Sequence, residues 1–591
     1  MAVGLLDQWL HSYPAGGDRV LSMIGIEVHW AILQYVLGLP FLAFITRLIY
    51  LKTGDEHWER LTKTLAKGFI LVFALGAATG TASEFGLVLL WPNLTEAAGD
   101  FIYFPLYAEI FAFLMEVVFL YMLWYGWDRL PLKAHTIVIL LGFLGAWYSA
   151  SMIVSVNSYM VAPTGIRPAY DPTTGTYLYS QGYPKLELHI PLKLNVTING
   201  QTASVSTLDL LNVTALQAAG MEVLGVDQQH GVVKVLMPVR IVQRLVMEAY
   251  HGYTIGESIL QYVVSKDFIQ QHQDIVPALL NVPVKEVVGQ IVKQTVRDVG
   301  VYTVTFKSPV YAASIAHVLG AGLTTSSFTV LAAYLLRYLQ YRGGGDYFEY
   351  VKKALTFAAF TAVIVIAVQG LVFGHEMGRA IAEYNPEKFA AMEATTNQVP
   401  NMAGPLKGLM HEKIMPLIAY GSTKAKLPEY DKIPEDYCVC KLSEVIHQQN
   451  PSIPSDTQRG LKDCRPPLII HYLYYTKIGL AVLLGLYALL ISFLIWRTRP
   501  DIAIPGWLAS LAYLVVPVVH LVSFMGWAVR EIGRKPWTIY GVMTPDVAHT
   551  VNPPSTAEIS IVAAYFIALL LVLAYAAYRI LWLPGKPGSE Y

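Results

Sequence analysis

The chain has few charged residues, and this shortage excludes an ordinary soluble domain. Asp, Glu, Lys and Arg make up 14% of its 591 residues, whereas about a quarter of the residues in a soluble globular domain are charged. Hydrophobic residues make up 54%, so the composition predicts a protein that crosses a membrane several times. Lys and Arg together number 42, as do Asp and Glu, so no positive excess points to nucleic acid as a partner.

Cysteine is nearly absent from the chain. Cys438, Cys440 and Cys464 lie in one polar segment, and their pattern suits no iron–sulfur cluster. On the outer face of a membrane a disulfide from Cys464 to either of the other two is allowed, and the third thiol stays unassigned. The first twenty residues also lack a compact apolar stretch and include Asp7 and His11. We therefore expect no cleavable signal peptide.

Long apolar runs, by contrast, are frequent, and each can cross about 30 Å of hydrocarbon as a helix. We expect roughly nine membrane-spanning helices, near residues 22–51, 66–91, 101–126, 134–160, 310–339, 353–374, 468–496, 503–530 and 558–583. The expected fold class is an all-α integral membrane protein. Basic residues gather in the connections at 52–65, 127–133, 340–352 and 497–502, whereas the connection at 92–100 has none. The positive-inside rule then places the N-terminus outside and the C-terminus in the cytoplasm.

The spans divide the chain into five expected parts. Residues 1–160 carry helices one to four, 161–309 form an extracytoplasmic insertion, 310–374 carry helices five and six, 375–467 form a second outer segment, and 468–591 carry helices seven to nine. The insertion contains an alternating run, 185–198, which predicts a strand. It also has helical patches near 236–250 and 281–297. We expect a small mixed α/β domain of unknown role.

Three polar side chains stand out inside the predicted spans. His29 lies in the first span, and Glu109 and Glu116 lie in the third. Polar groups are costly in hydrocarbon, so each is a functional hypothesis by default. The two carboxylates are close to two helical turns apart and can share one face. This set suits a metal cofactor, a proton path or both, although a lone histidine also serves as a core residue bonded to a backbone carbonyl.

A series of short motifs follows the spans in order. They are 73–80 (Phe-Ala-Leu-Gly-Ala-Ala-Thr-Gly) with Glu84-Phe85, Gly99-Asp100, Pro105-Leu106, 126–130 (Gly-Trp-Asp-Arg-Leu), 388–394 (Lys-Phe-Ala-Ala-Met-Glu-Ala) and 533–537 (Gly-Arg-Lys-Pro-Trp). In this order, and with this span pattern, the chain resembles subunit I of the cytochrome bd-type quinol oxidases. The resemblance covers all nine spans but not 161–309.

The resemblance implies a respiratory oxidoreductase in the cell membrane that oxidises quinol at the outer face and reduces O2 to water. It implies proton uptake from the cytoplasmic side and a contribution to the proton motive force. The implied cofactors are a low-spin haem b and a high-spin pair of haems, with haem b and either haem d or a further haem b. The implied partners are quinol, O2 and a second membrane subunit, either subunit II or a diverged copy of subunit I.

Roles follow from the resemblance position by position. His29 matches the axial ligand at the high-spin pair, and His317 matches the ligand of the low-spin haem b. Glu109 and Glu116 match carboxylates associated with proton delivery and haem coordination, at a spacing one residue shorter than the family's. His135 matches a family position too, but its place at the start of a span suits simple helix-end structure equally well.

The outer segment 375–467 corresponds to the family's Q-loop. Lys388 and Glu393 match its quinol-oxidation pair, in which a carboxylate accepts a proton and a cation orients an oxygen. The alternative is a solvated helix face. Arg534 and Trp537 match a boundary motif, where the arginine would neutralise haem propionates and the tryptophan would lie in the interfacial belt.

Two positions depart from the family. Phe524 stands where the family has a haem-associated glutamate, and Phe cannot ligate iron; His520, one turn earlier, is a substitute, and Met525 a weaker one. The family's methionine ligand to the low-spin haem is also missing, and Gly479 occupies its place.

In the seventh span, His471 is the only strong nitrogen ligand and Tyr475 an oxygen alternative; an interfacial, solvated role for His471 is equally open. These departures favour a second reading, a diverged non-catalytic paralogue that serves as a structural subunit. A transporter is a poor third, because no pair of broken helices or inverted repeat is visible.

Overall fold

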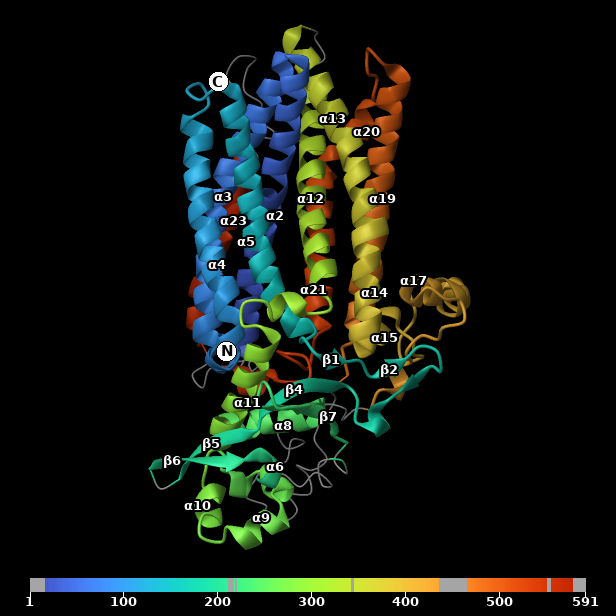
Figure 1. Ribbon diagram of the computed structural model, residues 1–591. Helices are drawn as coiled ribbons and strands as arrows, with labels where there is room; N and C mark the ends of the chain where they lie inside the picture. The colour runs from blue at the N-terminus through green and yellow to red at the C-terminus, as the bar shows by residue number, and fades with distance from the viewer. Residues whose placement is uncertain are drawn as a thin grey trace.

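The computed structural model describes residues 16–198, 200–210, 217, 220–341, 345–434, 465–549 and 554–577. The three cysteines, and with them the expected disulfide, lie outside the described residues. In the described part of the chain, eight helical spans are long and apolar enough to cross a membrane. They stand side by side in one bundle (Figure 1), which confirms the all-α membrane fold.

The spans are built from the following helices. They are α2 (Gly16–Thr53), α3 (Glu56–Leu90), α4 (Pro92–Tyr125), α5 (Leu132–Val161), α12 (Tyr311–Gln340), α13 (Asp346–Val368) continuing into α14 (His375–Tyr384), α19 (Ile469–Thr498), and α20 (Gly506–Ser510) followed by α21 (Ala512–Ile532). The expected ninth span corresponds to α23 (Thr556–Ala577), whose apolar described part, Thr556–Val572, is shorter.

Two helix boundaries differ from those expected. Residues 92–100 form the first turns of α4 rather than a connection, and only Trp91 separates α3 from α4. Pro92 starts the new helix because the first helical position needs no backbone N–H donor. The sixth span does not end at residue 374. A π-helix, η5 (Gln369–Gly374), carries it into α14.

Small residues bring α2 and α12 together at the centre of the bundle. A Cβ atom at Gly38 would lie 2.6 Å from the carbonyl oxygen of Gly322, so only glycine permits this approach. Thr325 also donates a hydrogen bond to the side-chain oxygen of Gln34 at 2.5 Å. These contacts fix the helix that bears His29 against the helix that bears His317.

The residues between α5 and α12 form the expected mixed α/β structure at one end of the bundle (Figure 1). Its antiparallel sheet has the order β1-β4-β8-β7, with β1 (Ile166–Arg167), β4 (Lys185–Pro191), β8 (Val232–Pro238) and β7 (Glu222–Asp227). The pair β2 (Tyr170–Asp171) and β3 (Thr176–Tyr177) and the pair β5 (Lys193–Ile198) and β6 (Gln201–Ser206) form two smaller sheets. The helices α8 (Val239–Tyr250) and α11 (Val284–Val299) match the two expected helical patches.

The prediction of one strand over 185–198 was wrong. The run is two strands in different sheets, since β4 pairs with β8 and β5 pairs with β6. The chain bends at Leu192, whose N–H bonds to Gly231 and whose carbonyl accepts from Thr207. Alternation continues across the bend, so the sequence pattern gave no sign of it.

Candidate functional site

A cavity of about 1660 Å³ lies among α2, α3, α4, α5, α21 and α23. It exceeds the roughly 300–1,000 Å³ of ordinary small-molecule sites, so it has room for more than one large flat ligand. Most of its wall is apolar. The acidic, basic and imidazole side chains in the wall are Glu27, His29, Glu84, Glu109, Glu116, Glu531, Arg534 and Lys535. The structure thus gathers three of the predicted residues of the first and third spans, His29, Glu109 and Glu116, around one space.

Two residues of α3, Thr79 and Gly76, hold the His29 ring by hydrogen bonds. The Nδ1 atom of His29 lies 3.0 Å from the hydroxyl of Thr79. That hydroxyl donates its own hydrogen to the helix carbonyls of Leu75 and Gly76, each at 3.1 Å. Thr79 must therefore accept from Nδ1–H, which leaves the Nε2 lone pair for a ligand. Gly80 leaves room for the ring, because a Cβ there would lie 3.1 Å from His29 Cε1.

Two helices, α3 and α4, supply Glu84, Glu109 and Glu116 to the cavity wall. Glu109 on α4 accepts a hydrogen bond from Ser149 at 3.0 Å and lies within hydrogen-bond reach of Glu84 on α3. Glu116 is 4% exposed and packs against α5, where a Cβ at Gly145 would lie 3.0 Å from its Cγ. Within the described residues its Oε1 has no hydrogen-bond partner. Such an oxygen can hold a proton for transfer or accept a bond from a ligand or water.

Sequence reasoning assigned no role to three carboxylates of this wall, Glu27, Glu84 and Glu531. Glu84 and Glu27 lie inside predicted spans, so the rule that selected Glu109 and Glu116 also applies to them. Glu27 lies on α2 near Glu531 of α21. Glu531 in turn accepts from Arg534 at 2.5 Å and from Asn157 at 3.2 Å.

The expected substitute for the missing glutamate does not reach the cavity. Phe524 lines the wall and is 44% exposed. His520 is absent from the wall, and its Nε2 lies 2.7 Å from the hydroxyl of Tyr35 on α2. Tyr35 also bonds to Thr329 on α12 at 3.1 Å. His520 thus ties three helices together, and the geometry does not support it as a replacement iron ligand.

His317 lies on α12 beside the π-helix η5. The side-chain amide of Gln369 donates to His317 Nδ1 at 3.2 Å and to the His317 carbonyl at 3.1 Å, while the amide oxygen has no partner among the described residues. In this arrangement His317 Nδ1 accepts from Gln369, and the backbone carbonyl of Phe373 also forms a hydrogen bond with the ring. At Gly479 on α19, a Cβ would meet nothing within 4 Å. The place of the family's methionine is therefore open space.

His471 has no free nitrogen. It is completely buried; its Nδ1 bonds to the Met392 carbonyl at 2.8 Å, and its Nε2 accepts from the Met402 N–H at 2.9 Å. Both partners belong to the Q-loop, so His471 fastens that loop to the start of α19. The geometry does not support the expected role as an iron ligand. The complete burial of His471 also excludes the interfacial, solvated role.

Both ring nitrogens of His135 are also occupied by hydrogen bonds. Its Nδ1 accepts from Arg47 at 3.0 Å, and its Nε2 bonds to the Leu123 carbonyl at 2.9 Å. Arg47 also forms an ion pair with Glu59 at 2.6 Å. His135 therefore joins helix ends, which agrees with the helix-end role that its position at the start of a span suggests.

Lys388 and Glu393 lie on the short helix α15 (Pro386–Glu393), and both are buried. Lys388 Nζ donates to the Arg530 carbonyl at the end of α21, at 3.2 Å. Gly533 permits this approach, because a Cβ there would lie 2.6 Å from Lys388 Cε. Glu393 accepts at 2.8 Å from the hydroxyl of Tyr475 on α19, and its Oε1 has no partner within the described chain. The two residues therefore act on different sides of α15 and do not pair.

Burial shifts the pKa values of Lys388 and Glu393 in the directions that favour their uncharged forms. Burial and the Arg530 charge lower the pKa of Lys388 to about 7. Burial raises the pKa of Glu393 to about 7. Each group can therefore change its protonation state near neutral pH, as acid–base chemistry requires.

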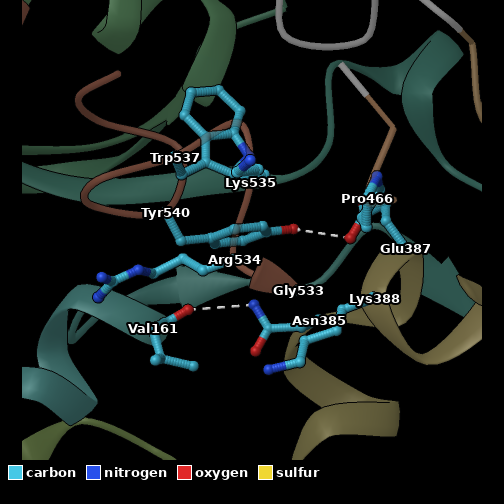
Figure 2. A pocket seen from close by; sticks show the side chains of 10 residues that line it. All are labelled: Val161, Asn385, Glu387, Lys388, Pro466, Gly533, Arg534, Lys535, Trp537 and Tyr540. Atoms are coloured by element: carbon cyan, nitrogen blue, oxygen red, sulfur yellow. Dashed lines mark hydrogen bonds between the residues drawn. The ribbon is translucent and has the colours of Figure 1, made fainter. Parts of the chain in front are cut away.

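A small pocket lies beside Lys388 (Figure 2). Glu387 accepts hydrogen bonds there from Tyr540 and Tyr179, each at 3.0 Å. Arg534 and Trp537 belong to the wall of this pocket and also to the wall of the large cavity. The Nη1 atom of Arg534 is buried without a partner in the part of the chain that the structure describes. The two hollows thus share a wall in which Arg534, ion-paired with Glu531, keeps one N–H group without a partner among the described residues.

Comparison with known families identifies what this arrangement is similar to. A family model described as cytochrome bd terminal oxidase subunit I matches residues 18–236 and 280–584. The match runs through much of 161–309 and leaves out only 237–279 between its two parts. The expectation that the resemblance stops at the insertion was therefore wrong.

Individual relatives agree with this match. A Bacillus subtilis protein named "Putative cytochrome bd menaquinol oxidase subunit I" is 21% identical over 574 residues, 95% of this chain and 96% of its own. The cytochrome bd-II ubiquinol oxidase subunit 1 of Escherichia coli is 36% identical over 138 residues, 23% of this chain and 27% of its own. The solved structure of bd oxidase from Geobacillus thermodenitrificans is similar in fold, with a TM-score of 0.61 and 21% identity over 97% of this chain and 99% of that one.

Proposed function

Because the chain belongs to the cytochrome bd terminal oxidase subunit I family, we propose that it oxidises membrane quinol at the outer face and reduces O2 to water within the bundle. Protons for water come from the cytoplasmic side, so turnover contributes to the proton motive force. The N-terminus lies outside and the C-terminus inside, in accordance with the basic connections. A second membrane subunit, either subunit II or a diverged copy of subunit I, completes the complex.

One observation carries this proposal. The pocket beside Lys388 and the cavity that contains His29 share Arg534 and Trp537 as wall residues. A quinol bound at α15 would therefore be separated from the contents of the cavity only by side chains. Oxidation and reduction need such closeness, because the electrons must cross from one site to the other.

At the quinol end, the two buried groups have complementary roles. The free Oε1 of Glu393 accepts a hydroxyl proton as electrons leave the ring. The Lys388 ammonium donates to a quinol oxygen and stabilises the negative charge that develops on it. Since the groups act on different sides of α15, they flank a ring rather than neutralise each other.

Haem fits the inner cavity on three counts. The wall is mostly apolar, His29 presents one free nitrogen, and Arg534 offers an unpaired N–H for a propionate. Haem bound there would supply the electron transfer and the oxygen chemistry. The proposed set is a high-spin pair, of haem b with haem d or a further haem b, near His29 and a low-spin haem b at His317.

The carboxylates of the cavity supply protons. Glu116 lies at membrane depth with a free oxygen, and Glu109 and Glu84 lie within reach of each other further along the wall. Carboxylates in such a place pass protons through bound water or through each other. Glu109 lines the same cavity, so its carboxylate could also help to hold the iron of a haem bound there.

A structural, non-catalytic paralogue is the second candidate. The observation that favours it is the loss of two ligand positions without a local substitute, since Phe524 lines the cavity and Gly479 faces open space. In that case the cavity near His29 would hold less haem than a full oxidase does.

Haem content separates the two candidates. The purified complex is tested by the pyridine haemochrome assay, by reduced-minus-oxidised spectra with and without CO, and by oxygen uptake with quinol. The oxidase proposal expects low-spin and CO-reactive high-spin signals together with quinol-driven oxygen uptake. A complex without haem would establish the structural paralogue.

A further inference from the structure

The Q-loop contains a helical segment at the edge of the bundle. Residues 404–420 comprise η6 (Gly404–Leu406), α16 (Lys407–Leu409), the π-helix η7 (Met410–Ile414) and α17 (Met415–Tyr420). Its inner side is anchored to the protein. Met415 and Ala419 are buried, and the Tyr420 hydroxyl donates to the Ala382 carbonyl of α14 at 3.3 Å.

The outer side of this segment carries four large apolar side chains next to two exposed charged residues, Glu412 and Lys413. Leu406, Leu409, Leu417 and Ile418 are 58%, 54%, 51% and 38% exposed. Leu406, Leu409, Lys413 and Leu417 follow the three-and-four spacing of one helical face. So many large apolar side chains on one short segment are costly in water, and they mark a surface that is covered.

The position of the segment indicates what covers it. Figure 1 shows α17 beside α14, near the end of the bundle at which this apolar span ends. Ile469 at the start of α19 is 53% exposed, and Leu371 in η5 is 79% exposed. The exposed apolar side of the bundle therefore continues onto this segment. Lys413 is also exposed and offers a cation to lipid phosphates.

We propose that residues 404–420 form an interfacial anchor that lies in the outer leaflet of the membrane. The four apolar side chains enter the boundary between headgroups and acyl chains, and Lys413 stays at the level of the phosphates. The anchor bears directly on the quinol site, because Asn401 and His411 hold the Glu393 carbonyl at 2.7 Å and 3.1 Å. It thereby sets Glu393 at a fixed depth relative to the lipid from which quinol arrives. This last step rests on the proposed function, whereas the lipid contact does not.

The lipid contact is tested in the intact complex. Cys438, Cys440 and Cys464 are first replaced by serine, and a single cysteine at position 409 is labelled with an environment-sensitive fluorophore in liposomes. Spin-labelled lipids should quench Leu409→Cys at a depth of about 5–10 Å. The matched label at Lys424→Cys, an exposed polar position just past the segment, should stay in water. A label at 409 that stays in water, or that is shielded from both water and lipid, overturns the proposal; the second result would mean that protein covers the face.

A second variant tests the link to quinol. Leu406→Glu with Leu409→Glu should abolish lipid quenching of a label at Leu417→Cys while the haem spectrum is unchanged. Turnover with a long-chain quinol in the bilayer should fall, and turnover with a short-chain, water-soluble quinol should be retained. Equal turnover of both quinols would overturn the link. A complex that oxidises neither quinol before mutation, yet shows quenching at position 409, would sink the proposed function and leave the anchor standing.

Discussion

The helices around the large cavity (the cavity half) differ from α15 and the start of α19 with the Q-loop (the Q-loop half) in how their histidines are bonded. In the cavity half, Thr79 occupies one nitrogen of His29 and leaves the other free. In the Q-loop half, Met392 and Met402 occupy both nitrogens of His471. Both histidines lie in predicted spans, and both are plausible ligands by residue type alone.

Carboxylates also differ in how completely they are bonded, but this difference occurs within α15 too, because Glu393 has an oxygen without a partner in the described structure. Glu116 in the cavity half has an oxygen without a partner in the described structure. Glu387 on α15 accepts from two tyrosines, one on each oxygen. A buried polar group whose bonds are complete stabilises the fold, whereas one with a free lone pair at a cavity wall is available to a ligand, a proton or water. The hydrogen bonds that each buried polar atom already makes therefore indicate the role of its side chain.

The largest effect expected is that of His29→Ala on the cavity half. The variant removes the free nitrogen, so the CO-reactive high-spin signal and the haem content should fall while the low-spin band remains. His230→Ala, on an exposed turn between β7 and β8, is the matched control and should change neither. An unchanged CO difference spectrum in His29→Ala would mean that the free nitrogen holds nothing.

Glu116→Gln should come next. It keeps the shape of the side chain but removes its ability to carry a proton, so oxygen uptake should fall by about 100-fold or more. Reduction of the haems by excess dithionite should persist, because no iron ligand is lost. Glu376→Gln on the surface of α14 is the control. Normal oxygen uptake in Glu116→Gln would show that the free oxygen is not on the proton path.

Much of the helical frame could be predicted from the sequence, because a long apolar run is a strong signal of a span. The ends of the helices were harder to predict. Pro92 starts a helix as readily as it follows a loop, and nothing in Gln369–Gly374 signals a π-helix that carries the sixth span onward. Each error concerns a boundary where two conformations satisfy the same local pattern.

The success of choosing site residues by their position in the sequence also differed between the two halves. The intramembrane position of His29, Glu109 and Glu116 was enough to select residues that meet at one cavity. Position was not enough for His471, whose partners Met392 and Met402 are 79 and 69 residues away in the chain. Bonds of this kind depend on the tertiary fold, so the sequence could not distinguish a fastening histidine from a ligand.

Quinol oxidation should slow both below and above an optimal pH. Glu393 must be deprotonated to accept a proton, and Lys388 must be protonated to bind an oxygen; both pKa values are about 7. The fraction of ready Glu393 rises through this pH, whereas the fraction of ready Lys388 falls, so kcat/KM for quinol should peak near neutrality. Glu393→Gln should slow quinol-driven turnover and remove the acidic limb, and Lys388→Ala should raise the apparent KM and remove the alkaline limb. Artificial reductants that bypass the Q-loop should still reduce the haems in both; equal losses with these reductants would indicate an unfolded loop.

The smallest effect on haem, and the sharpest test of the comparison, is expected for His471→Ala. The variant leaves the Met402 N–H and the Met392 carbonyl without partners, at a cost of about 1–3 kcal/mol for each buried group. The Q-loop should therefore become more sensitive to protease, and the KM for quinol should rise because Glu393 follows Met392 directly. Haem content and the low-spin band should stay unchanged, since neither nitrogen is free for iron. His471→Gln retains one donor and one acceptor and should restore part of the protease resistance. Loss of the low-spin haem in His471→Ala, with the loop still resistant to protease, would make His471 a ligand and break the distinction between the two halves.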